Sequence, residues 1–184
     1  LAPSVQLLVA CVGLATLLMA GFTAMTQHDI KRILAYSTIS QIGYMFLGLG
    51  VGAWSASVFH LMTHAFFKAL LFLAAGTVIY SLHHEHDIFK MGGKRKQLPI
   101  AFASFMVGSL ALAAFPFTSG YFSKDEILVV AYAAGGPGVW LWAGGVFGAF
   151  LTGIYSFRLV FVVFFGASQG HHDEKEKTGF SMAA

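Results

Sequence analysis

The sequence predicts an all-α protein, a polytopic bundle of about five membrane-spanning helices of which one is broken. Hydrophobic residues make up 57% of the 184-residue chain and charged residues only 10%, whereas soluble domains carry about 25% charged residues. The apolar residues also gather in five runs, each long enough to cross a hydrocarbon core about 30 Å thick. We therefore expect a transmembrane domain over residues 1–166 and a polar tail over residues 167–184.

The first three spans follow one another through short connections. A charged turn separates the first from the second, and a short uncharged turn makes the second and third antiparallel neighbours. The chain begins almost inside the first span, with neither an initiator Met nor a signal peptide. We interpret it as a piece of a longer polytopic protein. The five expected spans cover residues 4–26, 33–52, 56–80, 99–133 and 139–166.

The fourth span is too long for one straight helix, because residues 99–133 would then measure about 50 Å. A Phe-Pro-Phe-Thr-Ser-Gly sequence interrupts it at 115–120, and proline and glycine favour a break there, near 116–120. Unwound backbone at membrane depth is tolerated only against protein or a water-filled cavity. The alternative, a helix end at the membrane interface, conflicts with the apolar stretch that continues over 127–134.

The third span carries a row of ionisable residues inside an apolar run. His60, His64 and Lys68 are spaced four residues apart, which advances them about 40° per step around a helix and keeps them on one face. An ionisable group near the middle of a membrane costs a few kcal/mol or more, so such groups are functional by default. Groups that can each take up and release a proton, arranged in a line, predict a proton relay.

Charged residues also follow the predicted break directly, an arrangement typical of ion sites in transporters. Lys124 is therefore a fourth candidate for the relay. Asp125 and Glu126, together with Lys31 in the charged turn after the first span, are secondary candidates.

Polar residues mark the second span as well. Ser37, Gln41 and Tyr44 recur at helical spacing, with Tyr36 and Ser40 beside them. They either hold packed helices together through hydrogen bonds or order water beside the ionisable row.

The basic residues are concentrated on one side of the expected membrane. Of the eleven Lys and Arg residues, eight lie in the loops and tail of that side, which the positive-inside rule makes cytoplasmic. Topology thus accounts for the net charge of +3, and we expect a multi-pass protein of the inner (cytoplasmic) cell membrane, surrounded by lipid and without a nucleic-acid partner. Arg158, in the last span, is expected to extend to the interface. The eight residues are Lys31, Arg32, Lys90, Lys94, Arg95, Lys96, Lys175 and Lys177.

Metal and cofactor sites are not expected in this chain. Adjacent loop residues rarely converge on one metal ion, so the two histidine-rich segments do not predict a metal centre. Metal transport through the first of them is an alternative that changing its histidines would test. Cys11 is the only cysteine, and no glycine-rich turn follows a strand, which argues against a disulfide, an iron–sulfur cluster or a dinucleotide site. The two segments are His83, His84, Glu85, His86 and Asp87, and His171, His172 and Asp173.

Four motifs carry a resemblance to a known family. The stretches Asp29–Tyr44 and His60–Leu70 resemble the antiporter-like subunits of proton-pumping NADH:quinone oxidoreductase, respiratory complex I. The stretches Phe89–Gly93 and Phe122–Leu128 are similar, more narrowly, to its L subunit. The resemblance covers nearly all of the chain up to about Gly166.

The resemblance implies roles for these residues and for partners. It implies that His60, His64 and Lys68 belong to a buried polar axis, and that Lys124 on a discontinuous helix is a proton exit. It also implies that flavin, iron–sulfur clusters, NADH and quinone are bound by partner subunits, and that the other membrane-arm subunits are the partners. An upstream broken helix, a glutamate–lysine pair and a lateral helix of the family have no counterpart in this sequence.

Three functions are thus compared, besides metal transport through the histidine-rich loop. The first is a proton-translocating subunit of NADH:quinone oxidoreductase, without a redox site of its own. The second is the large subunit of an Mrp-type Na⁺/H⁺ antiporter, which shares this fold. The third is a structural membrane anchor, for which replacement of Lys68 by leucine would be harmless.

Overall fold

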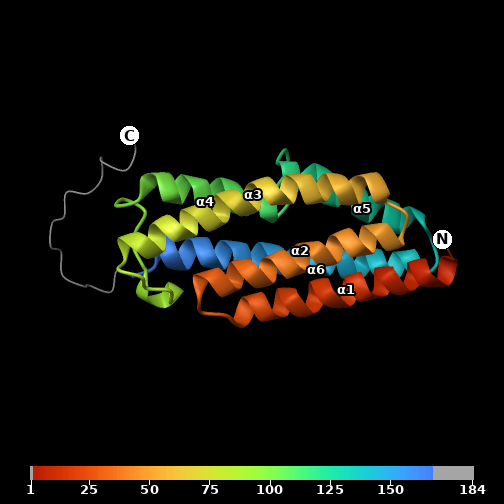
Figure 1. Ribbon diagram of the computed structural model, residues 1–184, viewed down its shortest axis with the longest axis horizontal. Helices are drawn as coiled ribbons and strands as arrows, with labels where there is room; N and C mark the ends of the chain where they lie inside the picture. The colour runs from red at the N-terminus through yellow and green to blue at the C-terminus, as the bar shows by residue number, and fades with distance from the viewer. Residues whose placement is uncertain (1, 168–184) are drawn as a thin grey trace.

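The computed structural model of the chain describes residues 2–167, which fold into a bundle of α-helices running along one long axis (Figure 1). A 3₁₀ turn, Ile88–Lys90, lies in the longest loop, and a π-helical turn, Phe161–Phe165, continues the last helix. No strand forms within the described residues, so the predicted all-α class is confirmed. The helices are α1 Pro3–Thr26, α2 Ile30–Gly50, α3 Trp54–Ser81, α4 Pro99–Leu112, α5 Ser119–Ala133 and α6 Pro137–Val160.

Four of these helices are long and apolar enough to cross a membrane: α1, α2, α3, and α6 with its π-helical continuation. The shorter helices α4 and α5 occupy the stretch expected as the fourth, broken span. The polytopic membrane bundle predicted from the sequence is therefore the observed architecture.

The break between α4 and α5 lies at residues 113–118 and not at 116–120 as expected. Ala114 and Phe117 both have positive φ, of 58° and 68°, a conformation that turns the chain sharply and ends the helix before Pro116. Ser119 and Gly120, expected within the break, are instead the first residues of α5. Gly120 packs against the backbone of Ala111 in α4, so the two half-helices touch across the break.

Helix α2 begins at Ile30, earlier than the expected start of its span at residue 33, because Asp29 caps it. The Asp29 carboxylate accepts hydrogen bonds from the backbone N–H groups of Lys31, at 2.8 Å, and Arg32, at 3.1 Å. Such a cap satisfies donors that have no partner within the helix. The charged turn predicted from the sequence is thus partly helical.

We expect Asp29→Ala to lower the free energy of unfolding by about 1 kcal/mol, the usual contribution of an N-cap side chain. Asp29→Asn should lower it much less, because asparagine offers the same capping oxygen without the charge. Thermal unfolding of the full-length protein carrying each variant measures the difference. Equal destabilisation by the two variants would contradict the capping role.

The loops gather at the two ends of the bundle (Figure 1). The α1–α2 turn and the α3–α4 loop meet at one end, where the backbone N–H of Ile30 donates to His86 and that of Ile88 to His28, each at 3.0 Å. The short α2–α3 and α5–α6 turns lie at the other end. The basic residues of the α1–α2 turn and of the α3–α4 loop therefore share one end of the bundle, as the charge pattern predicts.

Small residues bring α1 and α2 into close contact. A Cβ atom added at Gly43 would lie 2.6 Å from the backbone nitrogen of Leu17 and 2.8 Å from the carbonyl oxygen of Gly13. Backbones approach this closely only where side chains are absent, as is common between membrane helices. This packing holds α2 in place beside α3 and the ionisable row.

Candidate functional site

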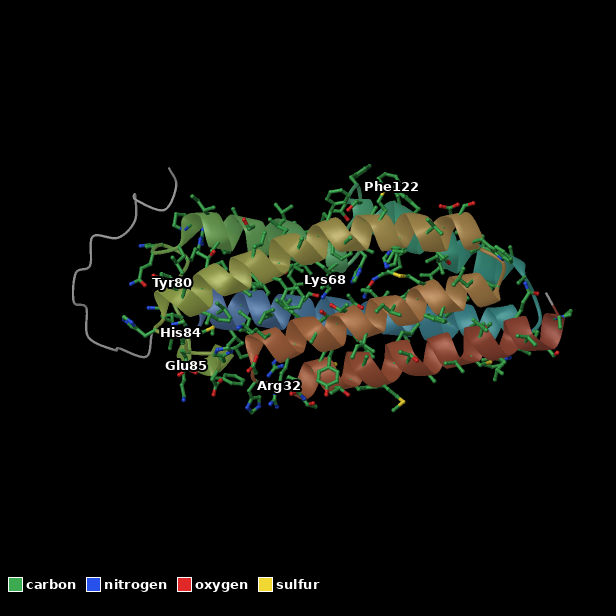
Figure 2. The ribbon with its side chains drawn as sticks, viewed as in Figure 1. Arg32, Lys68, Tyr80, His84, Glu85 and Phe122 are labelled. Atoms are coloured by element: carbon green, nitrogen blue, oxygen red, sulfur yellow. The ribbon has the colours of Figure 1, made fainter. Side chains whose placement is uncertain are left out.

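The three ionisable residues of α3 form one buried row. The exposed fraction of the residue is 0% for His60, 6% for His64 and 5% for Lys68, and the ring centroids of the two histidines are 6.2 Å apart. Figure 2 shows Lys68 near the middle of the bundle, far from Arg32, His84 and Glu85, which lie at the end where the α1–α2 turn and the α3–α4 loop meet. The face predicted from the four-residue spacing therefore points into the protein.

Lys68 is held by α2. Its Nζ donates to the carbonyl oxygen of Leu34, at 3.0 Å, and to the hydroxyl of Ser37. Within the described residues no carboxylate lies within salt-bridge distance of this amine. A buried amine without a counter-ion is costly in its charged form, so the hydroxyl and carbonyl are its main polar support. Ser37 is thus a partner of the row and not only a contact between helices.

His60 connects three helices. Its Nδ1 lies 2.8 Å from the hydroxyl of Ser123 in α5, and its Nε2 lies 3.2 Å from the side-chain oxygen of Gln41 in α2. The hydroxyl of Thr63 is 3.1 Å from that of Ser123. Both nitrogens of this buried ring therefore have a polar neighbour, which is the arrangement that a proton-carrying histidine needs.

Lys124 lies inside the bundle as well, with 1% of the residue exposed. Its Nζ donates to the carbonyl oxygen of Leu112, at 3.1 Å, the last residue of α4. The amine also lies 4.7 Å from the centroid of the Tyr44 ring, and Tyr44 donates its hydroxyl to Gly145. Carbonyl groups at a helix C-terminus attract cations, so the end of α4 at the break supplies the hydrogen-bond acceptor for this lysine.

The secondary candidates are not brought to this row. Lys31 is exposed at the start of α2, and Asp125 and Glu126 are exposed on α5. Successive helical positions point about 100° apart, so Asp125 and Glu126 turn away from the buried face of α5 that carries Ser123 and Lys124.

Ser123 and the carbonyl of Leu112 are the site groups that sequence reasoning missed. Ser123 directly precedes Lys124 in the chain, and that position was the available signal. Its contact with His60 depends on how α5 packs against α3, and no local pattern predicts that packing. The carbonyl of Leu112 carries no signal in the sequence at all.

Arg158 lies at the end of the bundle where the α1–α2 turn and the α3–α4 loop meet, as expected for an interfacial residue. It also makes specific hydrogen bonds there. Its guanidinium donates to the carbonyl oxygens of Met25, at 2.6 Å, and Gln27, at 3.1 Å, at the end of α1. It also lies 5.6 Å from the ring centroid of Phe89. Arg158 therefore ties α6 to the end of α1 and to the long loop.

The first histidine-rich segment organises that loop. The carboxylate of Glu85 accepts from the backbone N–H groups of His86 and Asp87, each at 2.9 Å, and these hydrogen bonds, Asp87 first, lower the pKa of Glu85. His86 lies 3.7 Å from Asp29. In the part of the chain that the structure describes, no three His, Cys, Asp or Glu residues are placed to hold a metal ion. The second segment, His171, His172 and Asp173, lies outside the described residues.

The fold and the buried row define a class, the polytopic helical membrane proteins with ionisable residues in their interior. The sequence pattern of the family described as NADH:quinone oxidoreductase/Mrp antiporter, transmembrane, matches residues 1–152. The chain belongs to this family.

Similar proteins include members of both branches of that family. The NADH-quinone oxidoreductase subunits L of Pseudomonas aeruginosa and Escherichia coli are 65% and 60% identical to the chain, over 90% and 92% of its length. The chain spans 27% of the length of each. A chain in the structure of the Mrp complex from Dietzia sp. DQ12-45-1b superposes with a TM-score of 0.82 at 28% identity, covering 89% of this chain and 30% of that one.

Proposed function

We propose that the chain is part of a proton-translocating membrane subunit of NADH:quinone oxidoreductase. The observation that carries the proposal is the row of His60, His64 and Lys68, with Lys124 beside it, all at least nine-tenths buried and without a carboxylate partner within the described residues. Isolated ionisable groups at membrane depth mark ion pathways. The high identity to the two L subunits supports this branch of the family.

The proposed relay follows α3. Protons pass along Lys68, His64 and His60 and reach Lys124 through α5. Ser123 of that helix contacts His60 and directly precedes Lys124 in the sequence. Ordered water completes the steps that no hydrogen bond spans, because proton transfer requires a continuous chain of donors and acceptors. Residues 1–166 constitute the antiporter-like domain and residues 167–184 a polar tail.

The redox chemistry belongs to other subunits in this proposal. NADH, flavin, iron–sulfur clusters and quinone are bound elsewhere in the complex, and the chain contributes proton movement coupled to their reactions. The partners are the other membrane-arm subunits and the lipid bilayer of the inner (cytoplasmic) membrane. No nucleic acid takes part.

The experiment compares complete complexes that carry Lys124→Met or Lys90→Met in vesicles. Lys90 is exposed in the long loop, so it controls for the loss of a lysine charge. We expect Lys124→Met to lower NADH-driven proton pumping by at least about ten-fold, since proton-transfer groups contribute about 100-fold or more. Electron transfer from NADH to an artificial acceptor should be unchanged in both complexes. Normal pumping with Lys124→Met would contradict the proposed relay.

The second candidate is the large subunit of a Na⁺/H⁺ antiporter, favoured by the likeness to the Mrp complex. In that case vesicles that contain the full-length protein and its partners would exchange Na⁺ for H⁺ without NADH. Proton pumping that requires NADH and is independent of Na⁺ would decide for the oxidoreductase.

A further inference from the structure

His60 differs from the other residues of the row in having a defined partner on each ring nitrogen. Ser123 lies at Nδ1 and Gln41 at Nε2, and all three side chains are fully buried. His64, one turn along the same face, has a buried Nε2 without any hydrogen-bond partner. The surroundings of His60 are therefore built for a particular task.

The hydroxyl of Ser123 can give its single proton either to His60 or to the backbone of its own helix. The Nδ1 atom of His60 lies 2.8 Å away, and the carbonyl oxygens of Ser119 and Gly120 lie 3.1 Å and 3.5 Å away. The hydroxyl of Thr63 lies 3.1 Å from the hydroxyl oxygen of Ser123 and can donate to it. Ser123 can thus donate to an unprotonated Nδ1, or donate to Ser119 and accept from a protonated Nδ1.

The amide of Gln41 offers the same choice at the other nitrogen. Its oxygen faces Nε2 of His60, at 3.2 Å, while its own nitrogen is buried without a partner. A half-turn of the amide exchanges the two atoms and presents a donor to His60 in place of the acceptor. Gln41 can therefore accept from a protonated Nε2 or donate to an unprotonated one.

We propose that Ser123 and Gln41 are positioning residues that let His60 exchange its protonation states without leaving either ring nitrogen unpaired. With the proton on Nδ1, His60 donates to Ser123 and accepts from Gln41. With the proton on Nε2, it accepts from Ser123 and donates to Gln41. The imidazolium donates to both. This inference rests on the proposed relay.

The arrangement gives one complete transfer step. A proton from the side of His64 arrives at one ring nitrogen through ordered water, and the imidazolium forms. The proton on the other nitrogen then leaves through ordered water towards Lys124, so that one proton enters and one departs. Ser123 and Gln41 rotate as the tautomer changes. Without them a buried donor or acceptor would be stranded in at least one state, which is costly, and the histidine would be trapped in one tautomer.

The test at position 123 uses a matched pair of variants in the complete complex. Ser123→Thr keeps the hydroxyl, and Ser123→Val has the same shape as threonine but no hydroxyl. We expect the valine complex to pump protons about five-fold more slowly than the threonine complex, the effect of losing one ordinary hydrogen bond. Ser57→Ala removes a buried hydroxyl that bonds only to its own helix, at Ala53, and should leave pumping unchanged. Equal pumping by the threonine and valine complexes would overturn the role of Ser123.

The test at position 41 is independent of the first. Gln41→Met keeps the length of the side chain and removes both donor and acceptor, whereas Gln97→Met does so in the exposed α3–α4 loop. We expect pumping to fall about five-fold only for Gln41→Met. The infrared ring bands of ¹⁵N-labelled histidine, assigned to His60 by their loss in His60→Phe, should also shift towards one tautomer. Normal pumping or an unchanged band would overturn the role of Gln41.

Failure of the inference can be told apart from failure of the relay itself. Lys68→Met, measured in the same vesicles, removes a relay member that contacts neither Ser123 nor Gln41 by hydrogen bond. Loss of pumping in Lys68→Met together with normal pumping in Ser123→Val and Gln41→Met would leave the relay standing and overturn the tautomer exchange. Normal pumping in all of them would overturn both.

Discussion

Complexes that carry Lys68→Met are expected to transfer electrons from NADH to an artificial acceptor at the wild-type rate and to pump few or no protons. Methionine is a good helix former and fills an apolar site, so α3 should remain intact. Ser37 keeps its hydrogen bond to the carbonyl of Leu34 at 2.8 Å, so α2 loses no internal bond. What disappears is the only side chain at this point of the row that can bind a proton. We expect pumping, and the quinone reduction coupled to it, to fall by about 100-fold.

Lys68→Arg separates the need for a charge from the need for a proton that can leave. Arginine keeps its proton at any working pH, so it preserves the charge but interrupts a relay. We expect this variant to pump poorly as well. Both activities are measured in vesicles at equal subunit content, with Lys90→Met as the control for an exposed lysine. Normal pumping by Lys68→Met would reduce Lys68 to a structural residue and favour the anchor function.

The helices and the buried face of α3 could be predicted because they depend on local pattern. Apolar runs set the lengths of the spans, and four-residue spacing places His60, His64 and Lys68 on one face whatever the tertiary structure. The same logic shows why Asp125 and Glu126 were poor candidates: on a helix they cannot share the direction of Lys124. The helical period therefore predicts which residues share a face wherever a single helix determines their direction.

The details of the site could not be predicted, because they depend on contacts between helices. The break was expected near 116–120, but α4 ends at Leu112, and positive φ at Ala114 and then Phe117 turns the chain sharply before α5 begins at Ser119. Neither residue is a glycine, so composition carried no warning. Likewise, the contacts of Ser123 with His60 and of Arg158 with the end of α1 join residues 63 and more than 130 positions apart.

The contact between the two half-helices leads to the second large effect, that of Gly120→Ala. A Cβ atom at Gly120 would overlap the carbonyl oxygen of Ala111 and lie 2.9 Å from its carbonyl carbon. Both atoms belong to the backbone of α4, so no side chain can rotate to make room. The start of α5 would have to move away from α4, and Lys124 would lose its position at the carbonyl of Leu112.

We therefore expect Gly120→Ala to destabilise the full-length subunit by about 3 kcal/mol, the upper part of the usual range for overpacking, and to lower its content in assembled complexes. Gly153→Ala is the matched control, because a Cβ atom there meets nothing within 4 Å and alanine is the better helix former by about 1 kcal/mol. Thermal unfolding and subunit content are measured for both variants. If Gly120→Ala unfolded at the wild-type temperature and pumped normally, α4 and α5 would not need their close contact, and the break would not be what places Lys124.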